Sequence, residues 1–62
     1  MNYQEILNKG SKNLKNKKIK NPNLESELIL SKVLNKSREQ IILNSNNHIN
    51  QNYIDIFRMH YT

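Results

Sequence analysis

The sequence contains no cysteine, one glycine and one proline among its 62 residues. Without cysteine, neither a disulfide nor a Cys/His zinc site can stabilise so short a chain, and His48 and His60 are twelve positions apart. With a single glycine, the chain cannot form the glycine-rich loop that holds a phosphate or a dinucleotide. A chain of this length is one domain at most, and it must fold by helix packing, by leaning on a neighbouring domain or by oligomerising.

Long hydrophobic runs are also missing. The longest runs are three residues, Leu28-Ile29-Leu30 and Ile41-Ile42-Leu43. A membrane-spanning helix needs about 20 apolar residues, and a signal peptide needs a run of about 7–15. We therefore expect no membrane partner and predict a soluble cytoplasmic protein. The lack of cysteine is compatible with the reducing environment of the cytosol.

No arrangement of side chains points to catalysis. Glu39 and Asp55 are not members of a carboxylate pair at short spacing, and no Ser/His/Asp or Cys/His arrangement is present. His60 is better explained as a helix-end or interface residue than as a ligand. The sequence therefore predicts no catalytic, cofactor-binding or metal-ligating residue, and it does not decide whether the chain is part of an enzyme.

Positive charge, in contrast, is abundant, with 10 Lys and Arg against 5 Asp and Glu and a net charge of +5. Such a charge is typical of nucleic-acid-binding proteins. Compositional drift in a genome poor in G and C is the second explanation, because Asn, Lys and Ile are frequent and Ala is absent. We favour drift, and the six lysines from Lys9 to Lys20 are explained by a solvated face.

The first predicted helix covers residues 3–15. Asn2 can cap it, with Glu5 three residues later and close to the positive end of the helix dipole. Gly10 costs about 1 kcal/mol in a helix interior relative to Ala, so we interpret it as a point of close approach by another helix. A helix break at Gly10-Ser11 is the alternative. In the continuous helix, the apolar side chains and Gly10 form one stripe, which consists of Tyr3, Ile6, Leu7, Gly10 and Leu14.

A basic linker, residues 15–20, precedes the second predicted helix, and we expect Ile19 to enter the core. Asn21 is the expected N-cap and Pro22 the first helical residue, where its missing N–H is harmless. The apolar residues of this helix cover much of its circumference, which predicts the central and most buried helix. They are Leu24, Leu28, Ile29, Leu30, Val33 and Leu34.

Two shorter helices complete the expected fold. Asn35-Lys36 forms a corner, and Ser37 with Gln40 forms a capping box at the start of the third helix. The fourth helix starts near Asn50, with Ile49 and Ile54 placed as a hydrophobic staple. The aromatic residues are expected in the core or at its rim rather than on a base-stacking platform; they are Tyr3, Tyr53, Phe57 and Tyr61. No strand pattern appears, so we predict an all-α fold, a small bundle of four short helices, with a fifth helix missing from this chain if the chain is truncated.

One run of residues has a distinctive order, in which Pro22, Glu25, Leu28 and Ile29 or Leu30 are followed by Ser37 and Arg38. This order resembles the P-x-x-[DE]-A-x-x-L-L run and the S-R-x-x-L helix start of the bacterial release factor glutamine methyltransferases, the PrmC/HemK family. Ser26 stands where the family pattern has Ala. The likeness is to the family's N-terminal helical domain and covers nearly the whole chain, although no single motif is unique to the family. We therefore expect residues 1–62 to form one helical domain.

The resemblance implies a role in translation termination. Family members methylate the Gln side chain in the Gly-Gly-Gln loop of class-1 peptide chain release factors, with S-adenosylmethionine as cofactor. That chemistry belongs to a C-terminal Rossmann-like domain with a Gly-rich loop and an Asn-Pro-Pro-Tyr motif, and neither motif is present here. By resemblance, this chain is the substrate-recognition domain, and its partners are the release factor and its own C-terminal methyltransferase domain.

A basic face would suit such a partner, because the surfaces of release factors include acidic patches. The residues that we expect on this face are Lys9, Lys12, Lys15 and Lys17, with Arg38 nearby. The residues with expected structural roles are Gly10, Asn21, Pro22, Leu24, Leu28, Leu30, Ser37 and Gln40.

Two other classes of function stay open. A small basic nucleic-acid-binding protein would bind with an affinity that falls steeply with salt. Nucleic acid is not the expected partner, however, because three apolar residues directly follow Arg38-Glu39-Gln40 and make this helix a poor reader of bases. The other class is a stand-alone interaction bundle, and the reading frame downstream of Thr62 would distinguish it from the first domain of a methyltransferase.

Overall fold

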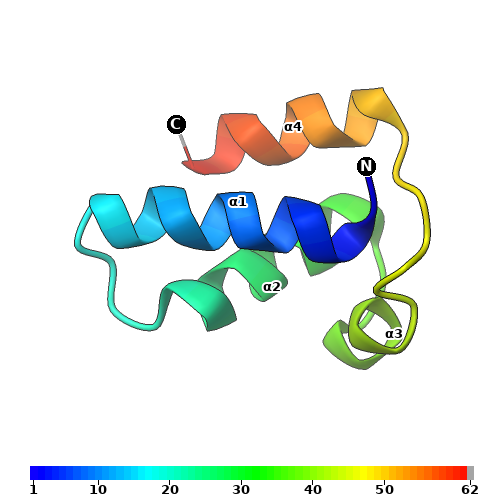
Figure 1. The fold of residues 1–62 in the computed structure, drawn as a ribbon, viewed down its shortest axis with the longest axis horizontal. Coiled ribbons are helices and arrows are strands. Elements are labelled where there is room, and N and C mark those ends of the chain that lie inside the picture. Colours follow the sequence, from blue (N-terminus) through cyan, green and yellow to red (C-terminus); the bar gives the residue numbers. More distant parts are fainter. Residues whose placement is uncertain (62) are drawn as a thin grey trace.

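The computed structural model describes residues 1–61, with Tyr61 described by its backbone alone, and shows four helices. They are α1 (Tyr3–Asn16), α2 (Pro22–Leu34), α3 (Arg38–Leu43) and α4 (Gln51–Tyr61). Helices α1, α2 and α4 pack against one another in pairs, and α3 packs mainly against α2. Figure 1 shows that α2 runs antiparallel to α1, whereas α4 runs in the same direction as α1. The predicted all-α bundle is therefore confirmed.

Helix α1 begins with a capping box. The Glu5 N–H donates to Asn2 Oδ1 at 2.9 Å, and the Asn2 N–H donates to Glu5 Oε1 at 3.0 Å. The next free donors of the first turn, the N–H groups of Tyr3 and Gln4, bond to carbonyls in the loop before α4. The five residues of the predicted stripe are the buried residues of this helix, and the helix continues through Gly10 without a break.

Gly10 lies where three helices meet. A Cβ atom at this position would lie 2.6 Å from Ser26 Oγ on α2 and 2.7 Å from Phe57 Cζ on α4. Ser26 is completely buried, and its hydroxyl donates to the Leu7 carbonyl on α1 at 3.0 Å. The predicted close approach at Gly10 is therefore confirmed, and it involves two neighbouring helices at once.

The linker after α1 reverses the chain through left-handed backbone conformations. Lys18 has φ 62°, and the Ile19 N–H donates to the Leu14 carbonyl at 3.0 Å, which is the pattern of a Schellman motif. This motif leaves Ile19 at the end of α1 with 41% of its surface exposed. The prediction that Ile19 enters the core is therefore wrong, because the tight turn ends at the rim of the bundle.

Pro22 is the first residue of α2, as expected, but Asn21 does not cap the helix with its side chain. Asn21 has φ 55°, in the left-handed region that Asn tolerates better than most residues. Its carbonyl accepts the Glu25 N–H at 3.1 Å, while its side chain makes no capping hydrogen bond. The expected role of Asn21 is corrected accordingly: it is a turn residue whose backbone begins the helix.

Helix α2 contacts every other helix but is not the most buried one. Only Ser26 and Leu30 are buried, whereas Leu24 and Leu28 are 36% and 42% exposed. Residues four apart share one side of a helix, so Leu24 and Leu28 lie together on the side opposite Ser26 and Leu30. The predicted burial of α2 is wrong because the other helices cover one side of it only.

Helices α3 and α4 each place few side chains in the core. Helix α3 starts with the predicted capping box of Ser37 and Gln40, and Ile41 is its one buried residue. In α4, Ile54 and Phe57 point inward, together with Ile49 from the preceding segment. Tyr3 and Phe57 are thus core residues and Tyr53 lies at the rim, whereas the side chain of Tyr61 lies outside the described residues. Among the described residues, no helix has the length and apolarity required to cross a bilayer.

Candidate partner-binding groove

A groove of about 670 Å³ is formed mainly by α1, α4 and the segment that precedes α4. Ile6, Ile49 and Ile54 form its apolar floor, and all three belong to the hydrophobic core. The amide side chains of Asn13 and Gln51 contribute to its walls. An apolar floor with polar groups on the walls is the general composition of ligand and peptide sites.

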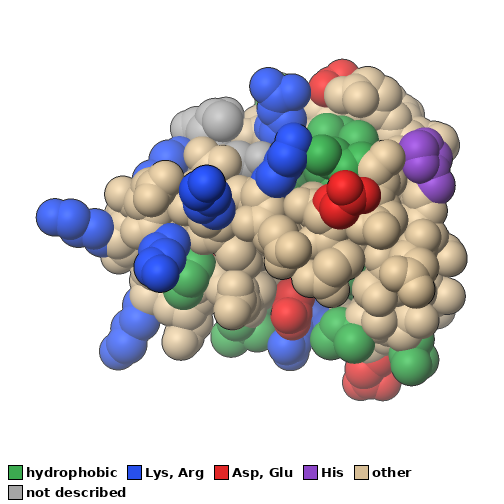
Figure 2. Space-filling model, viewed as in Figure 1, with side chains coloured by type: hydrophobic (Ala, Val, Ile, Leu, Met, Phe, Trp, Pro, Cys, Tyr) green, Lys and Arg blue, Asp and Glu red, His purple; other side chains and the backbone are tan. Residues whose placement is uncertain are grey.

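Three cationic side chains line this groove, namely Lys9 and Lys12 from α1 and Arg58 from α4. None of them has an ion-pair partner among residues 1–61. Figure 2 shows Lys and Arg side chains over α1 and α4, with hydrophobic atoms between the two helices. Charges of one sign along a cleft focus the electrostatic potential there, so the groove attracts anionic groups.

Two acidic residues, Glu5 and Asp55, are sequence neighbours of the groove residues Ile6 and Ile54 but do not themselves line the groove. Glu5 accepts the Asn2 N–H in the capping box at 3.0 Å. Asp55 Oδ1 accepts a hydrogen bond from Gln51 Nε2 at 3.0 Å. Both carboxylates thus have hydrogen-bond donors within the chain. The charged side chains that line the groove are cationic, while Figure 2 shows acidic side chains beside the hydrophobic atoms between α1 and α4.

Backbone hydrogen bonds fix the end of the groove at the start of α1. The Tyr3 N–H donates to the Asn47 carbonyl at 3.1 Å, and the Ile49 N–H donates to the Met1 carbonyl at 2.9 Å. An isolated antiparallel bridge joins Asn2 and His48 between them. The segment before α4 is therefore tied to the N-terminal segment, and this connection sets the position of α4 beside α1.

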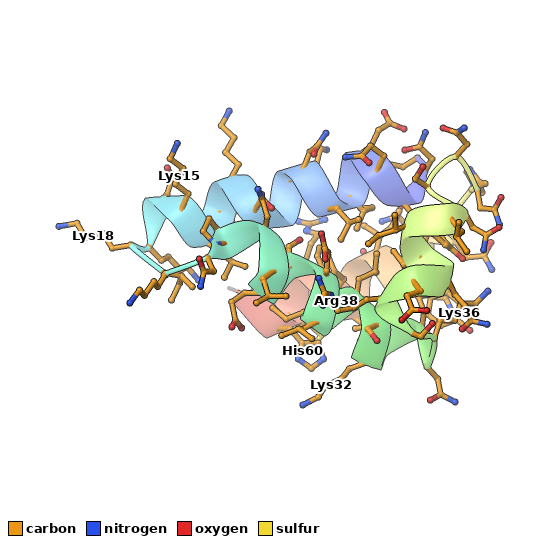
Figure 3. All side chains as sticks on the ribbon, turned by 90° about the horizontal axis from the view of Figure 1, so that it is seen from below. Lys15, Lys18, Lys32, Lys36, Arg38 and His60 are labelled. Atoms are coloured by element: carbon orange, nitrogen blue, oxygen red, sulfur yellow. The ribbon has the colours of Figure 1, made fainter. Side chains whose placement is uncertain are left out.

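The structure divides the five expected partner-binding residues among separate places. Lys9 and Lys12 line the groove, whereas Lys15 and Lys17 do not. Arg38 lies on α3, where its Nη2 is 2.8 Å from Glu27 Oε1. Figure 3 shows Lys15 pointing away from the bundle and Arg38 next to α2, far from one another.

Arg58 is a cationic residue of the groove that was not among the expected partner-binding residues. It follows Ile54 by four positions, so the two side chains share one side of α4. This spacing was visible in the sequence and could have marked Arg58 as lying beside the core. It could not show that α4 packs beside α1, which is what brings Arg58 to Lys9 and Lys12.

Metal binding has no candidate ligands in the part of the chain that the structure describes. No group of three or more His, Cys, Asp or Glu side chains is close enough there to hold a metal ion. His60 is exposed on α4, at its C-terminal end.

The architecture defines a small all-helical domain of the bundle class. The family model described as the PrmC N-terminal domain matches residues 5–59, and the chain belongs to this family. The resemblance inferred from the order of residues from Pro22 to Arg38 is thereby confirmed. None of the curated proteins or solved structures matches the chain.

Ser26 departs from the family pattern that the sequence suggested, in which Ala occupies this position. The structure accommodates the change, because the side chain is small enough for the contact with Gly10 and its hydroxyl donates to the Leu7 carbonyl. No buried polar atom is left without a partner among the described side chains.

Proposed function

We propose that this chain is the substrate-recognition domain of a release factor glutamine methyltransferase and that it binds a class-1 peptide chain release factor. The observation that carries the proposal is membership of the PrmC N-terminal domain family over residues 5–59. In this proposal, a C-terminal domain uses S-adenosylmethionine to methylate the Gln of the Gly-Gly-Gln loop. The chain itself supplies no catalytic group, and the reaction takes place in the cytoplasm, where release factors act.

The physical contribution of such a domain is binding energy from a surface remote from the reacting atoms. Energy gained there can orient the Gln side chain in a distant catalytic pocket, which raises the rate of a step that depends on position. The groove with Lys9, Lys12 and Arg58 supports this role, because these cations have no ion-pair partner among residues 1–61 and a cationic surface accelerates the encounter with an acidic partner.

A titration tests the proposal. The 62-residue chain is titrated with the class-1 release factors of its host at about physiological salt, with duplex DNA and RNA as competitors. We expect saturable binding to a release factor that survives both competitors. Binding to nucleic acid alone, lost steeply as salt rises, would instead indicate a small nucleic-acid-binding protein, and binding to neither would indicate a stand-alone bundle.

A further inference from the structure

We infer that the groove between α1 and α4 takes an acidic polypeptide segment, whose carboxylates pair with Lys9, Lys12 and Arg58 while one of its apolar side chains covers the floor. The inference rests on the proposed function in that the partner is a protein. Beyond the proposed function, it specifies that the groove between α1 and α4 is the binding surface and that the bound segment is acidic with an apolar side chain.

The arrangement of charge favours a carboxylate-bearing segment. Lys9 and Lys12 are three positions apart, so they lie along one wall of the groove, and Arg58 lies on the helix that forms the other wall. All three side chains are exposed and have no ion-pair partner among residues 1–61. The guanidinium of Arg58 can donate two parallel hydrogen bonds to a carboxylate. An acidic segment would thus meet cations on both sides of the groove.

The floor favours a segment that also carries an apolar side chain. Ile6, Ile49 and Ile54 line the groove while being only 1%, 2% and 7% exposed. Because these side chains are held in the core, the floor has a fixed shape before any partner binds. A preformed apolar floor lowers the ordering cost of binding and selects a partner side chain by its size.

The same features argue against nucleic acid and against a bilayer. Single-stranded nucleic acid binds where exposed aromatic rings stack on bases, but Tyr3 and Phe57 are buried and Tyr53 does not line the groove. A helix that lies on a membrane inserts an exposed apolar face, whereas Ile6 and Ile54 are recessed at the bottom of a cationic groove. A protein segment fits both the charge and the recessed floor.

The test compares two charge-reversed chains of equal net charge. K12E combined with R58E removes cations from both walls of the groove, and K20E combined with K32E removes two exposed cations that neither line it nor belong to the expected partner-binding face. Exposed substitutions of this kind change stability little, and circular dichroism checks that both chains stay helical. The probes are a short labelled peptide that alternates Glu with Leu, the same peptide with Ser in place of Leu, and an RNA oligonucleotide of equal length.

We expect the Glu/Leu peptide to bind the unmodified chain and the K20E/K32E chain with similar affinity. The K12E/R58E chain should bind it at least about tenfold more weakly, with most of the loss in the association rate. The Ser-containing peptide should bind about tenfold more weakly than the Leu-containing one, since the floor then has no apolar partner. Equal weakening by both charge-reversed pairs, equal binding of the two peptides, or tighter binding of the RNA would each overturn the inference.

The same chains, titrated with the release factor, separate this inference from the proposed function. Release-factor binding that K12E/R58E weakens and K20E/K32E leaves unchanged supports both. Release-factor binding that neither pair weakens overturns the groove as the docking surface and leaves the proposed function standing. Groove-dependent peptide binding without any release-factor binding supports the inference and contradicts the proposed function.

Discussion

Replacing Gly10 by Ala would add one methyl group at the junction of α1, α2 and α4. The new Cβ would lie under 3 Å from both Ser26 Oγ and Phe57 Cζ. Ser26 and Phe57 are each 0% exposed, and the Ser26 hydroxyl is held by the Leu7 carbonyl. Neither neighbour is the free end of a flexible surface side chain, so we expect α1 to be displaced from α2 and α4.

Two opposing energies set the size of the effect. Ala gains about 1 kcal/mol over Gly in a helix interior. Overpacking a well-packed core costs about 1–3 kcal/mol, and two simultaneous close contacts place Gly10 near the upper end of that range. The free energy of unfolding should therefore fall by about 1–2 kcal/mol, which lowers the melting temperature of a domain of this size by roughly 4–16 °C.

Thermal and urea unfolding, followed by the helical circular dichroism signal, would measure this loss. Ser11→Ala is the matched control, because Ser11 is the next residue of the same helix and is only half-buried. That control should gain a few tenths of a kcal/mol from helix propensity. A Gly10→Ala chain that is as stable as the unmodified chain, or more stable, would refute the close packing of the three helices at Gly10.

Three further substitutions test the helix ends and the surface ion pair. Lys18→Gly should raise the free energy of unfolding by up to about 1 kcal/mol, because glycine adopts the left-handed backbone of Lys18 without a steric penalty; an unchanged melting temperature would argue against strain there. Ser37→Ala should lower the free energy by about 1 kcal/mol, because the Gln40 N–H loses its acceptor. Hydrogen exchange at that amide should accelerate, and unchanged exchange would speak against the capping box. Glu27→Gln should cost less than about 1 kcal/mol at low salt and nothing measurable at high salt, since the pair with Arg38 is partly exposed. Urea unfolding at two salt concentrations measures this, and a larger loss that persists at high salt would show that the pair is structural.

The ends of the helices could be predicted from the sequence because each end depends on a few neighbouring residues. The pairs Asn2 with Glu5 and Ser37 with Gln40 are local signals, and both capping boxes are present in the structure. Asn21 shows the limit of this argument. Its residue type suits an N-cap, but its backbone conformation is set by the turn that joins α1 to α2.

Burial depends on which sides of a helix are covered, and composition does not contain that information. Leu24, Leu28 and Leu30 are the same residue type in one helix, yet only Leu30 is buried. The stripe on α1 was predicted correctly because its apolar residues occupy a single face. On α2 the apolar residues surround the helix, so the sequence could not indicate which of them faces α1 and α4.

The groove was predictable only in part. Lys9 and Lys12 could be assigned to one face from their spacing on α1. Arg58 reaches them through the packing of α4 beside α1, and Arg38 is held on another helix by Glu27. Both relations are tertiary contacts between distant parts of the chain, so no local pattern signals them.

The most direct test of release-factor recognition is a titration of the isotope-labelled chain with the class-1 release factor of its host, followed by the backbone amide signals in nuclear magnetic resonance spectra. We expect saturable changes that centre on Lys9, Lys12 and Arg58, with smaller changes at Leu24 and Leu28 on the opposite side of α2 from the core. Spectra that do not change at any ratio of release factor to chain would contradict the claim that this domain recruits the release factor.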